Sequence, residues 1–375
     1  MNVVILKSAV KNQGGLEKTT ARIARAFKEQ GANVSILTTM HSNQRFLDIP
    51  THSLKTWRWP TFVRMQQFDQ AAQKWLKTSP AQVVFGMDRN KWQTHLRTGN
   101  GVHAAYLQSR RLSEGKWKYR SCLANPFHQM VLRLEKKAFE NPALKKIFAN
   151  SHMVKQEILD RFCVDPSKIC VVHNGVEWHE LQEPFTSWPE QKLIHCKRLG
   201  LDPNAFHLLF IGSGYLRKGL SQLLVALSVL KRKEVHITIL GKDRRIEFYR
   251  SLTQKLGLCA QVHFFGPQSN PIPFYQIADV LTIPSFYDPF ANVTVEALAM
   301  GLFVVSSKTN GGSEVLTTKS GVIIEDLTNA DSLVEALKIA LMHPKTEKNA
   351  REIRNVVQHL DYQKQLQQIV ELSLA

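Results

Sequence analysis

Long apolar runs are missing from this sequence. No stretch approaches the roughly 20 apolar residues that a membrane-spanning helix needs. The opening MNVVILK has only four apolar residues in a row before Lys7, which is too short for the core of a signal peptide, so we expect a first buried strand there. The five cysteines are odd in number and form no CxxC pair, which disfavours a disulfide framework or a zinc ribbon. These absences favour a protein of the reducing cytoplasm.

Acidic residues are scarce relative to basic ones, with 31 Asp and Glu against 49 Lys and Arg and a net charge of +18. The excess is uneven, because residues 1–187 carry 28 basic and 14 acidic side chains, whereas residues 188–375 carry 21 and 17. A field of this sign attracts anions, so we expect the first half to meet nucleic acid, an anionic membrane leaflet or a phosphorylated acceptor. A basic, solvated surface without a partner is the alternative.

Strand-like and helix-like segments alternate along most of the 375 residues, a length that predicts two domains. Residues 2–6 and 33–39 are predicted strands, with a helix over 16–30 between them, and a second alternating run extends over 207–341. Such units build doubly wound parallel sheets. The predicted fold class is therefore α/β, with two doubly wound Rossmann-like domains facing across a cleft.

A linker between these domains is predicted over residues 180–192, which contain Pro184 and Pro189 and show little periodicity. Residues 55–77 interleave aromatic and basic side chains, which is compatible with a membrane-interface helix. The favoured interpretation is an ordinary amphipathic helix packed on the first sheet.

One candidate site begins at Asp288, just after the predicted strand VLTIPS, and ends at Glu296 in the next helix. The free N–H groups around Ala291, Asn292 and Val293 are typical of a phosphate site at a helix start. Glu296 is a candidate to accept hydrogen bonds from a ribose, and Asp288 to hold sugar hydroxyls. A helix cap and a surface glutamate are the alternative reading.

A second candidate site follows another predicted strand, in the loop Gly212-Ser213-Gly214-Tyr215-Leu216-Arg217-Lys218-Gly219. Glycine lets a backbone approach a ligand closely. Arg217 and Lys218 place positive charge where a leaving diphosphate gains negative charge, which stabilises the transition state without a metal. A solvated basic turn is the alternative.

Gly14 and Gly15 lie between the first predicted strand and helix, where close approach to a ligand is also expected. The surrounding sequence is not a P-loop, because that motif needs Gly directly before Lys and Glu17 stands there. His103 follows the Gly-rich turn at residues 99–102 in the basic half, and an isolated histidine of this kind is more often structural.

Taken in order, Gly14-Gly15, His103, the triplets Asn174-Gly175-Val176 and Arg217-Lys218-Gly219, and the acidic pair Asp288 and Glu296 resemble family 4 retaining glycosyltransferases of GT-B fold. The resemblance covers essentially the whole chain. It implies that residues 1–179 bind the acceptor and residues 193–359 the nucleotide-sugar, with a final helix at about 360–375 crossing back to the first domain.

The resemblance also implies residue roles. Arg217 and Lys218 contact the diphosphate, Glu296 holds the ribose, and His103 touches the primary hydroxyl of the donor sugar. Gly14, Gly15, Gly212 and Ser213 lie along the donor. Asp288 stands where the family usually has Glu, and Ser213 where many members have Arg.

The stretch Gly101-Val102-His103-Ala104-Ala105-Tyr106-Leu107-Gln108-Ser109-Arg110-Arg111 is similar to lipopolysaccharide core glycosyltransferases. This similarity implies that Tyr106, Arg110 and Arg111 bind the acceptor. The expected reaction moves a hexose from a nucleotide-sugar, with UDP-sugar as first choice, to a sugar hydroxyl of an anionic glycolipid on the inner face of the membrane.

Neither a DxD-like motif nor a cofactor signature is present, so a reaction without metal or cofactor is expected. A nucleotide-sugar epimerase of the same fold is the rival enzyme, although it would need no basic acceptor domain. A nucleic-acid-binding protein would account for the charge, but no RNA module, zinc finger or recognition helix is evident, so no nucleic-acid partner is expected.

Overall fold

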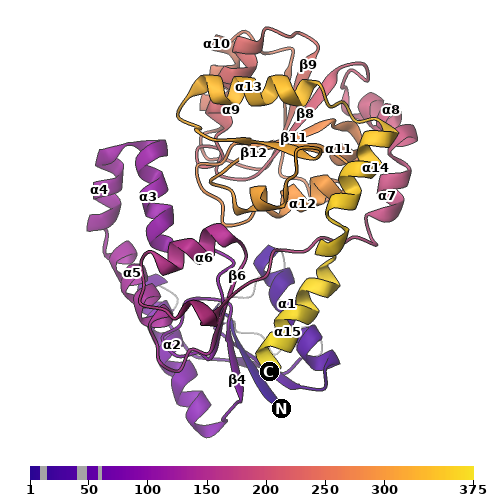
Figure 1. Cartoon of the computed structure of the whole chain (residues 1–375). Helices are drawn as coiled ribbons and strands as arrows, with labels where there is room; N and C mark the ends of the chain where they lie inside the picture. Colours follow the sequence, from indigo (N-terminus) through magenta and orange to yellow (C-terminus); the bar gives the residue numbers. More distant parts are fainter. Residues whose placement is uncertain (9–14, 40–48, 58–60) are drawn as a thin grey trace. The chain divides into compact units, whose positions relative to one another are not determined.

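The computed structural model describes residues 1–8, 15–39, 49–57 and 61–375, and it divides into two compact units (Figure 1). Unit 1 comprises residues 1–173 and 363–375, and unit 2 comprises residues 174–362. Each unit is a parallel β-sheet with helices around it, which confirms the predicted α/β class and the two Rossmann-like domains.

Unit 1 contains a seven-stranded parallel sheet in the order β3-β2-β1-β4-β5-β6-β7. Its strands are β1 (Asn2–Leu6), β2 (Asn33–Thr38), β3 (Thr51–Ser53), β4 (Val83–Gly86), β5 (His95–Arg97), β6 (Lys146–Ala149) and β7 (Ile169–Val171). Its helices are α1 (Gly15–Glu29), α2 (Thr61–Thr78), α3 (His103–Glu114), α4 (Lys116–Ala124), α5 (Pro126–Phe139) and α6 (His152–Leu159), with a 3-10 turn at Pro166–Lys168.

The central strands of this sheet are nearly continuous apolar runs, because helices cover both faces. One face packs against α1 and the last helix, α15 (Tyr362–Leu374), whose Ile369 and Val370 are buried in the unit 1 core. The other face packs against α2 through Phe68, Ala72 and Leu76. Residues 61–78 thus form the amphipathic helix on the sheet that was favoured for this segment. Trp59 lies outside the described residues.

Unit 2 contains a six-stranded parallel sheet in the order β10-β9-β8-β11-β12-β13. Its strands are β8 (Phe206–Ile211), β9 (Val235–Leu240), β10 (Val262–Gly266), β11 (Val280–Ile283), β12 (Phe303–Ser307) and β13 (Gly321–Ile324). Its helices are α7 (Gln182–Thr186), α8 (Trp188–Leu199), α9 (Leu220–Leu230), α10 (Ile246–Lys255), α11 (Ile272–Ile277), α12 (Asn292–Ala299), α13 (Ala330–Leu341) and α14 (Glu347–Val356), with 3-10 turns at Gly311–Val315 and Gln358–Leu360.

The strand order reverses direction between β8 and β11, as it does between β1 and β4 in unit 1. This is the order of a dinucleotide-binding sheet, in which ligands bind beyond the carboxyl ends of the strands at the reversal point. The loops that follow β8 and β11 are therefore the first place to examine in unit 2.

The predicted linker at residues 180–192 is wrong. These residues form α7 and the first turn of α8, and they belong to unit 2. Proline is tolerated at a helix start, where Pro189 stands, and Phe185 and Trp188 are buried in the unit 2 core. The division of the structure falls after residue 173, whereas the sequence placed it between residues 179 and 193.

Within the part of the chain that the structure describes, no helix combines the length and the apolar character that a membrane span requires.

Candidate functional site

Two loops meet at the reversal point of the unit 2 sheet. Gly219 ends the first loop, after β8, with a φ of 74°, a left-handed conformation that favours glycine. A Cβ on Gly219 would lie 1.9 Å from the carbonyl oxygen of Pro284, in the loop after β11. Glycine therefore allows the two loops to touch, and the two preceding residues, Arg217 and Lys218, are carried to the end of β11.

Both of these cations bind Asp288. The Nζ of Lys218 lies 2.5 Å from Oδ2 of Asp288, and Nη1 of Arg217 lies 3.2 Å from the same oxygen. Arg217 also donates to the carbonyl oxygen of Tyr287 at 2.7 Å. Burial works to raise the pKa of Asp288, but the charges of Lys218 and Arg217 outweigh it and hold the pKa below its ordinary value. The aspartate is therefore ionised at neutral pH.

The Asp288 carboxylate is bound by both cations here, and its predicted contact with sugar hydroxyls stays a prediction. A carboxylate that accepts from two cations fixes the orientation of both. Lys218 and Asp288 are both buried. Because two cations share one carboxylate, the cluster keeps a net charge of +1. The Arg217 side chain is 36% exposed, so that charge is accessible to an anion.

The amino end of α12 adjoins this cluster. Ala291 is its N-cap residue, and no side chain among the described residues caps the first turn. Asn292 is exposed and Val293 is half-buried. An uncapped first turn leaves N–H groups that bind an anion. The helix start and the cation cluster therefore offer two kinds of anion contact within one short segment.

Asn310, in the loop after β12, fixes this helix start. Its Oδ1 accepts from the backbone N–H of Ala291 at 3.0 Å and of Gly312 at 3.1 Å. Its Nδ2 donates to Ser306 Oγ at 2.9 Å and to Thr294 Oγ1 at 3.3 Å. Asn310 is fully buried, so these bonds form away from water. The sequence signal for this residue was the Asn-Gly-Gly turn after a predicted strand.

Glu296 lies further along α12 and is positioned by a residue that the sequence did not single out. The hydroxyl of Tyr275, on α11, donates to Oε2 of Glu296 at 2.7 Å. Burial, together with the Glu296 charge, raises the pKa of Tyr275 well above its ordinary value, so the hydroxyl keeps its proton. Glu296 is half-buried. One of its oxygens is thereby fixed by the protein.

Gly212 and Ser213, at the start of the loop after β8, are held by the neighbouring loop after β9. Gly212 donates its N–H to the carbonyl of Leu240 at 3.0 Å, and Ser213 Oγ accepts from the N–H of Lys242 at 3.2 Å. A Cβ on Gly241 would lie 2.1 Å from the Gly212 carbonyl oxygen. Ser213 is exposed.

In unit 1, His103 is the first residue of α3 and is held by a buried carboxylate that sequence reasoning missed. Glu135, on α5, is fully buried and accepts from the N–H of His103 at 2.7 Å and of Ala104 at 3.3 Å. The same carboxylate binds Nε of Arg89 at 2.7 Å, and Arg89 also donates to the carbonyl of Gly101 at 2.8 Å. An anion at a helix amino end is favourable.

The imidazole of His103 is kept neutral. Its pKa is lowered to about 4 by burial and by the nearby charges of Arg89 and His128. Its Nε2 lies 3.0 Å from Nδ1 of His128. A neutral imidazole both donates and accepts hydrogen bonds, which suits contact with a hydroxyl.

Tyr106, Arg110 and Arg111 lie further along α3. The ring of Tyr106 is 5.9 Å from that of His103, one helical turn away. Arg110 binds Glu114 through two nitrogens and donates to Cys122 Sγ at 2.9 Å, so its guanidinium already has protein partners. Arg111 is exposed. Of the two arginines, Arg111 is the one more open to an acceptor.

The loop after β1 is tied to the loop after β4. Asp88 binds Nζ of Lys7 at 2.7 Å and accepts from both the N–H and the Oγ of Ser8 at 2.8 Å. Gly14 lies outside the described residues, and Gly15 is the first residue of α1. The predicted roles of these two glycines stay predictions.

Comparison with protein families matches both halves of the chain. Residues 13–179 match the family model described as Glycosyltransferase Family 4, and residues 192–356 match the model described as Glycosyl transferases group 1. The two matches together cover most of the chain, which therefore belongs to the glycosyltransferases that these models describe.

Curated relatives differ in how much of their length is matched. The lipopolysaccharide glucosyltransferase WaaG of Escherichia coli is 23% identical over 337 residues, which is 88% of this chain and 86% of the relative. An uncharacterized glycosyltransferase of Methanocaldococcus jannaschii is 29% identical over 191 residues, 50% of this chain and 48% of the relative. A D-inositol 3-phosphate glycosyltransferase of Mycolicibacterium gilvum is 30% identical over 177 residues, 44% and 37% of the two chains. The chain thus spans about half or less of the last two relatives.

Solved structures match over the whole chain. A crystal structure of WaaG, a glycosyltransferase involved in lipopolysaccharide biosynthesis, has a TM-score of 0.79 at 19% identity and covers 99% of both chains. Anabaena HepE in complex with UDP-glucose has a TM-score of 0.69 at 16% identity and covers 100% of this chain and 99% of the other. These likenesses show the fold, which is GT-B. None of the relatives described here supports the epimerase or nucleic-acid-binding alternatives.

Proposed function

We propose that this protein transfers a hexose from a nucleotide-diphosphate sugar to a sugar hydroxyl of a lipopolysaccharide core or a similar anionic glycolipid, with retention of the anomeric configuration. The observation that carries this proposal is the cluster of Lys218, Arg217 and Asp288 beside the uncapped start of α12. A diphosphate needs both cations and N–H donors, and this segment of unit 2 offers both. UDP-sugar is the first-choice donor, in line with the UDP-glucose in the HepE complex.

In the proposed reaction, the bond between the anomeric carbon and the diphosphate oxygen breaks. The new bond to the acceptor oxygen forms on the same face, and the departing phosphate takes the acceptor proton. Arg217 and Lys218 stabilise the charge that grows on the diphosphate. Because these fixed cations supply that stabilisation, we propose that the reaction needs no metal and no cofactor. Glu296, oriented by Tyr275, holds the ribose, and neutral His103 contacts a hydroxyl of the donor sugar.

The acceptor side of the proposal rests on charge and on relatives. Unit 1 contains 29 Lys and Arg against 12 Asp and Glu, a net charge of +17, whereas unit 2 contains 20 against 19. Nearly all of the excess is therefore on the domain to which acceptor binding is assigned. A phosphorylated, acidic glycolipid fits this field. The names of WaaG and its solved structure point to the same acceptor class.

Membrane association is part of the same proposal. Helices α3 and α4 of unit 1 stand side by side (Figure 1), and they expose Leu112 and Trp117, whose exposed fractions are 60% and 83%. Exposed basic residues accompany them, namely Arg111, Lys116, Lys118 and Arg120. Apolar side chains between cations are typical of a surface that lies on an anionic leaflet. We therefore propose a peripheral enzyme of the cytoplasmic membrane face.

The donor assignment is tested by thermal shift with UDP-, GDP- and ADP-glucose, followed by calorimetry of Lys218→Ala. A ligand at 100 times its Kd stabilises the folded state by about 2.7 kcal/mol, so the correct donor raises Tm most. Lys218→Ala should weaken donor binding at least about 10-fold, which is 1.4 kcal/mol. Lys338→Ala, which removes an exposed lysine of α13, is the matched control and should bind normally. Unchanged donor affinity in Lys218→Ala contradicts the diphosphate site.

A further inference from the structure

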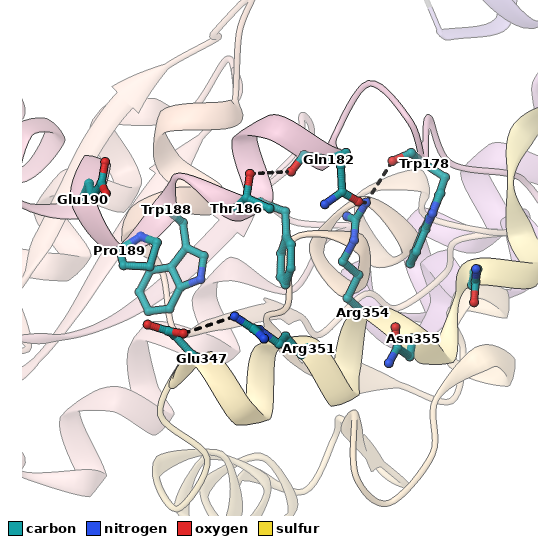
Figure 2. A pocket seen from close by; sticks show the side chains of 12 residues that line it. Trp178, Gln182, Thr186, Trp188, Pro189, Glu190, Glu347, Arg351, Arg354 and Asn355 are labelled. Carbon is teal, nitrogen blue, oxygen red and sulfur yellow. Dashed lines mark hydrogen bonds and ion pairs between the residues drawn. The ribbon is translucent and has the colours of Figure 1, made fainter.

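A cavity of about 550 Å³ lies in unit 2, apart from the candidate site (Figure 2). It is bounded by α7, the start of α8 and α14, and it is lined by Trp178, Gln182, Phe185, Thr186, Trp188, Pro189, Glu190, Glu347, Arg351, Arg354, Asn355 and Gln358. Arg354 donates to the carbonyl of Ala299, the last residue of α12. The candidate anion site is at the first residue of α12, seven residues before Ala299, so the two ends lie about 10 Å apart along the helix.

Buried cations hold the aromatic walls of this cavity in place. The guanidinium carbon of Arg354 lies 3.9 Å from the ring centre of Trp178 and 4.7 Å from that of Phe185. Arg354 also donates to Trp178 O at 2.9 Å and to Gln182 Oε1 at 3.1 Å, and Figure 2 shows it beside Trp178. Lys345 Nζ lies 4.6 Å from the ring centre of Trp188. Rings fixed by buried cations form a rigid surface.

The rim of the cavity is polar and exposed. It combines acceptors, Glu190 and Glu347, with side chains that donate, Arg351 and Asn355, and with the amides of Gln182 and Gln358. The Glu347–Arg351 pair is 3.3 Å apart and spans one helical turn. A hydroxyl group donates one hydrogen bond and accepts others, so a polyhydroxylated ligand needs such a mixed rim.

The charges that line the cavity balance. Two glutamates, Glu190 and Glu347, and two arginines, Arg351 and Arg354, are among the lining residues, so their charges sum to zero. A phosphate or a nucleic acid would meet two carboxylates and gain little, whereas a neutral ligand meets no net field. The flat apolar face of a sugar ring fits the half-buried ring of Trp178, and its hydroxyl groups fit a rim of amides, carboxylates and guanidinium groups.

We propose that this cavity is a second saccharide-binding site and that it takes a neutral oligosaccharide. The cavity lies apart from the proposed diphosphate site of unit 2, and the inference does not rest on the assignment of that site. It gives the protein a second place in unit 2 to hold a saccharide chain.

The test uses the full-length protein labelled with 5-fluorotryptophan and followed by fluorine NMR. Trp178 and Trp188 are the only tryptophans of unit 2, and both line the cavity. The fluorine signal of each is assigned by its disappearance in Trp178→Phe or Trp188→Phe. Maltotriose and cellotriose are titrated to about 10 mM, where a site with a Kd near 1 mM is about 90% occupied. At least one trisaccharide should shift both signals in a saturable way.

The double variant Glu347→Ala/Arg351→Ala removes an exposed ion pair from the rim, and it should bind the active trisaccharide at least 5-fold more weakly. Glu335→Ala/Lys338→Ala removes a comparable exposed pair from α13 and should bind normally. The proposal is overturned if neither trisaccharide shifts the two signals, if both double variants bind equally, or if sodium sulfate produces the same shifts as the saccharide.

Discussion

At the scale of single residues, Asp288 connects two cations that the proposed reaction uses. Replacing it by Asn removes the charge that balances buried Lys218, while it keeps an oxygen that accepts a hydrogen bond. We expect Asp288→Asn to lower the free energy of unfolding by about 1–3 kcal/mol, because a buried charged donor loses its ionised partner. Urea denaturation measures this change.

The matched control for Asp288→Asn is Glu325→Gln. Glu325 forms an exposed ion pair with Lys308 at 3.5 Å, and such pairs contribute about 0–1 kcal/mol. If the two variants are equally stable, the ion pairs of Asp288 do not stabilise the fold, and its carboxylate is available to bind a ligand instead.

His95 gives the second residue-scale prediction, which concerns pH. This histidine of β5 is buried between the rings of Phe85 and Phe148, and burial with the charges of Lys145 and Lys146 lowers its pKa to about 4. In the unfolded chain, the imidazole of His95 binds a proton below about pH 6.5. Between those values the unfolded state holds more protons, so stability falls as the pH is lowered from 6.5 towards 4.

A His95→Gln variant should therefore show a shallower loss of stability over this pH range, measured as urea midpoints at several pH values. The unaltered protein is the reference for this comparison. Parallel curves for the two proteins would argue that His95 is not the group responsible.

At the scale of elements, the contact between the loops after β8 and β11 depends on Gly219. An alanine there meets both a left-handed φ of 74° and a Pro284 oxygen 1.9 Å from its Cβ. Gly214, in the same loop, has a φ of 77° but nothing within 4 Å of its Cβ position. An alanine at Gly214 therefore tests backbone strain alone, whereas an alanine at Gly219 tests backbone strain together with a steric clash.

We expect Gly214→Ala to cost about 1 kcal/mol in stability, the usual penalty of a left-handed alanine. Gly219→Ala should cost at least about 2 kcal/mol more and should also weaken binding of the proposed nucleotide-sugar donor, because Arg217 and Lys218 move with the loop. Denaturation and calorimetry on the two variants check this order. Equal losses would mean that the loops do not need their present contact.

The elements that sequence patterns predicted are those with long apolar runs. Strands β1, β2 and β11 lie within residues that the sequence assigned to strands, because buried parallel strands are almost continuously apolar. Strand β5 was missed, since His95 and Arg97 are polar and are buried only by their neighbours in the sheet. The linker prediction failed because proline at a helix start looks, in sequence, like a break.

Candidate-site residues were predictable where they follow strands along the chain. Arg217, Lys218 and Asp288 were found in this way, and the structure brings them together. The Glu135–Arg89 pair, 46 residues apart, and the Tyr275–Glu296 pair, on different helices, were not found. The first pair joins the loop after β4 to α5, and the second joins α11 to α12. Each depends on tertiary packing, which the local residue patterns do not record.

At the scale of the whole molecule, the charge difference between domains becomes larger when the structural boundary is used. Residues 174–187 contain three glutamates and no lysine or arginine, and they belong to unit 2 rather than to the basic half. Unit 1 thus carries +17 and unit 2 carries +1. Folding therefore concentrates the positive field on one domain, which favours a specific anionic partner over a generally basic protein.

This charge distribution leads to a prediction on membrane binding. The protein should sediment with liposomes that contain about 30% anionic lipid and should be released as salt screens the attraction, since each Lys or Arg near such a surface contributes about 1 kcal/mol. Trp117→Ala, at the exposed end of the α3–α4 pair, should weaken binding several-fold through lost apolar contact. Trp92→Ala removes another exposed tryptophan of unit 1 and is the control. Equal binding to neutral liposomes would refute the electrostatic account, and equal effects of the two variants would place the contact elsewhere on unit 1.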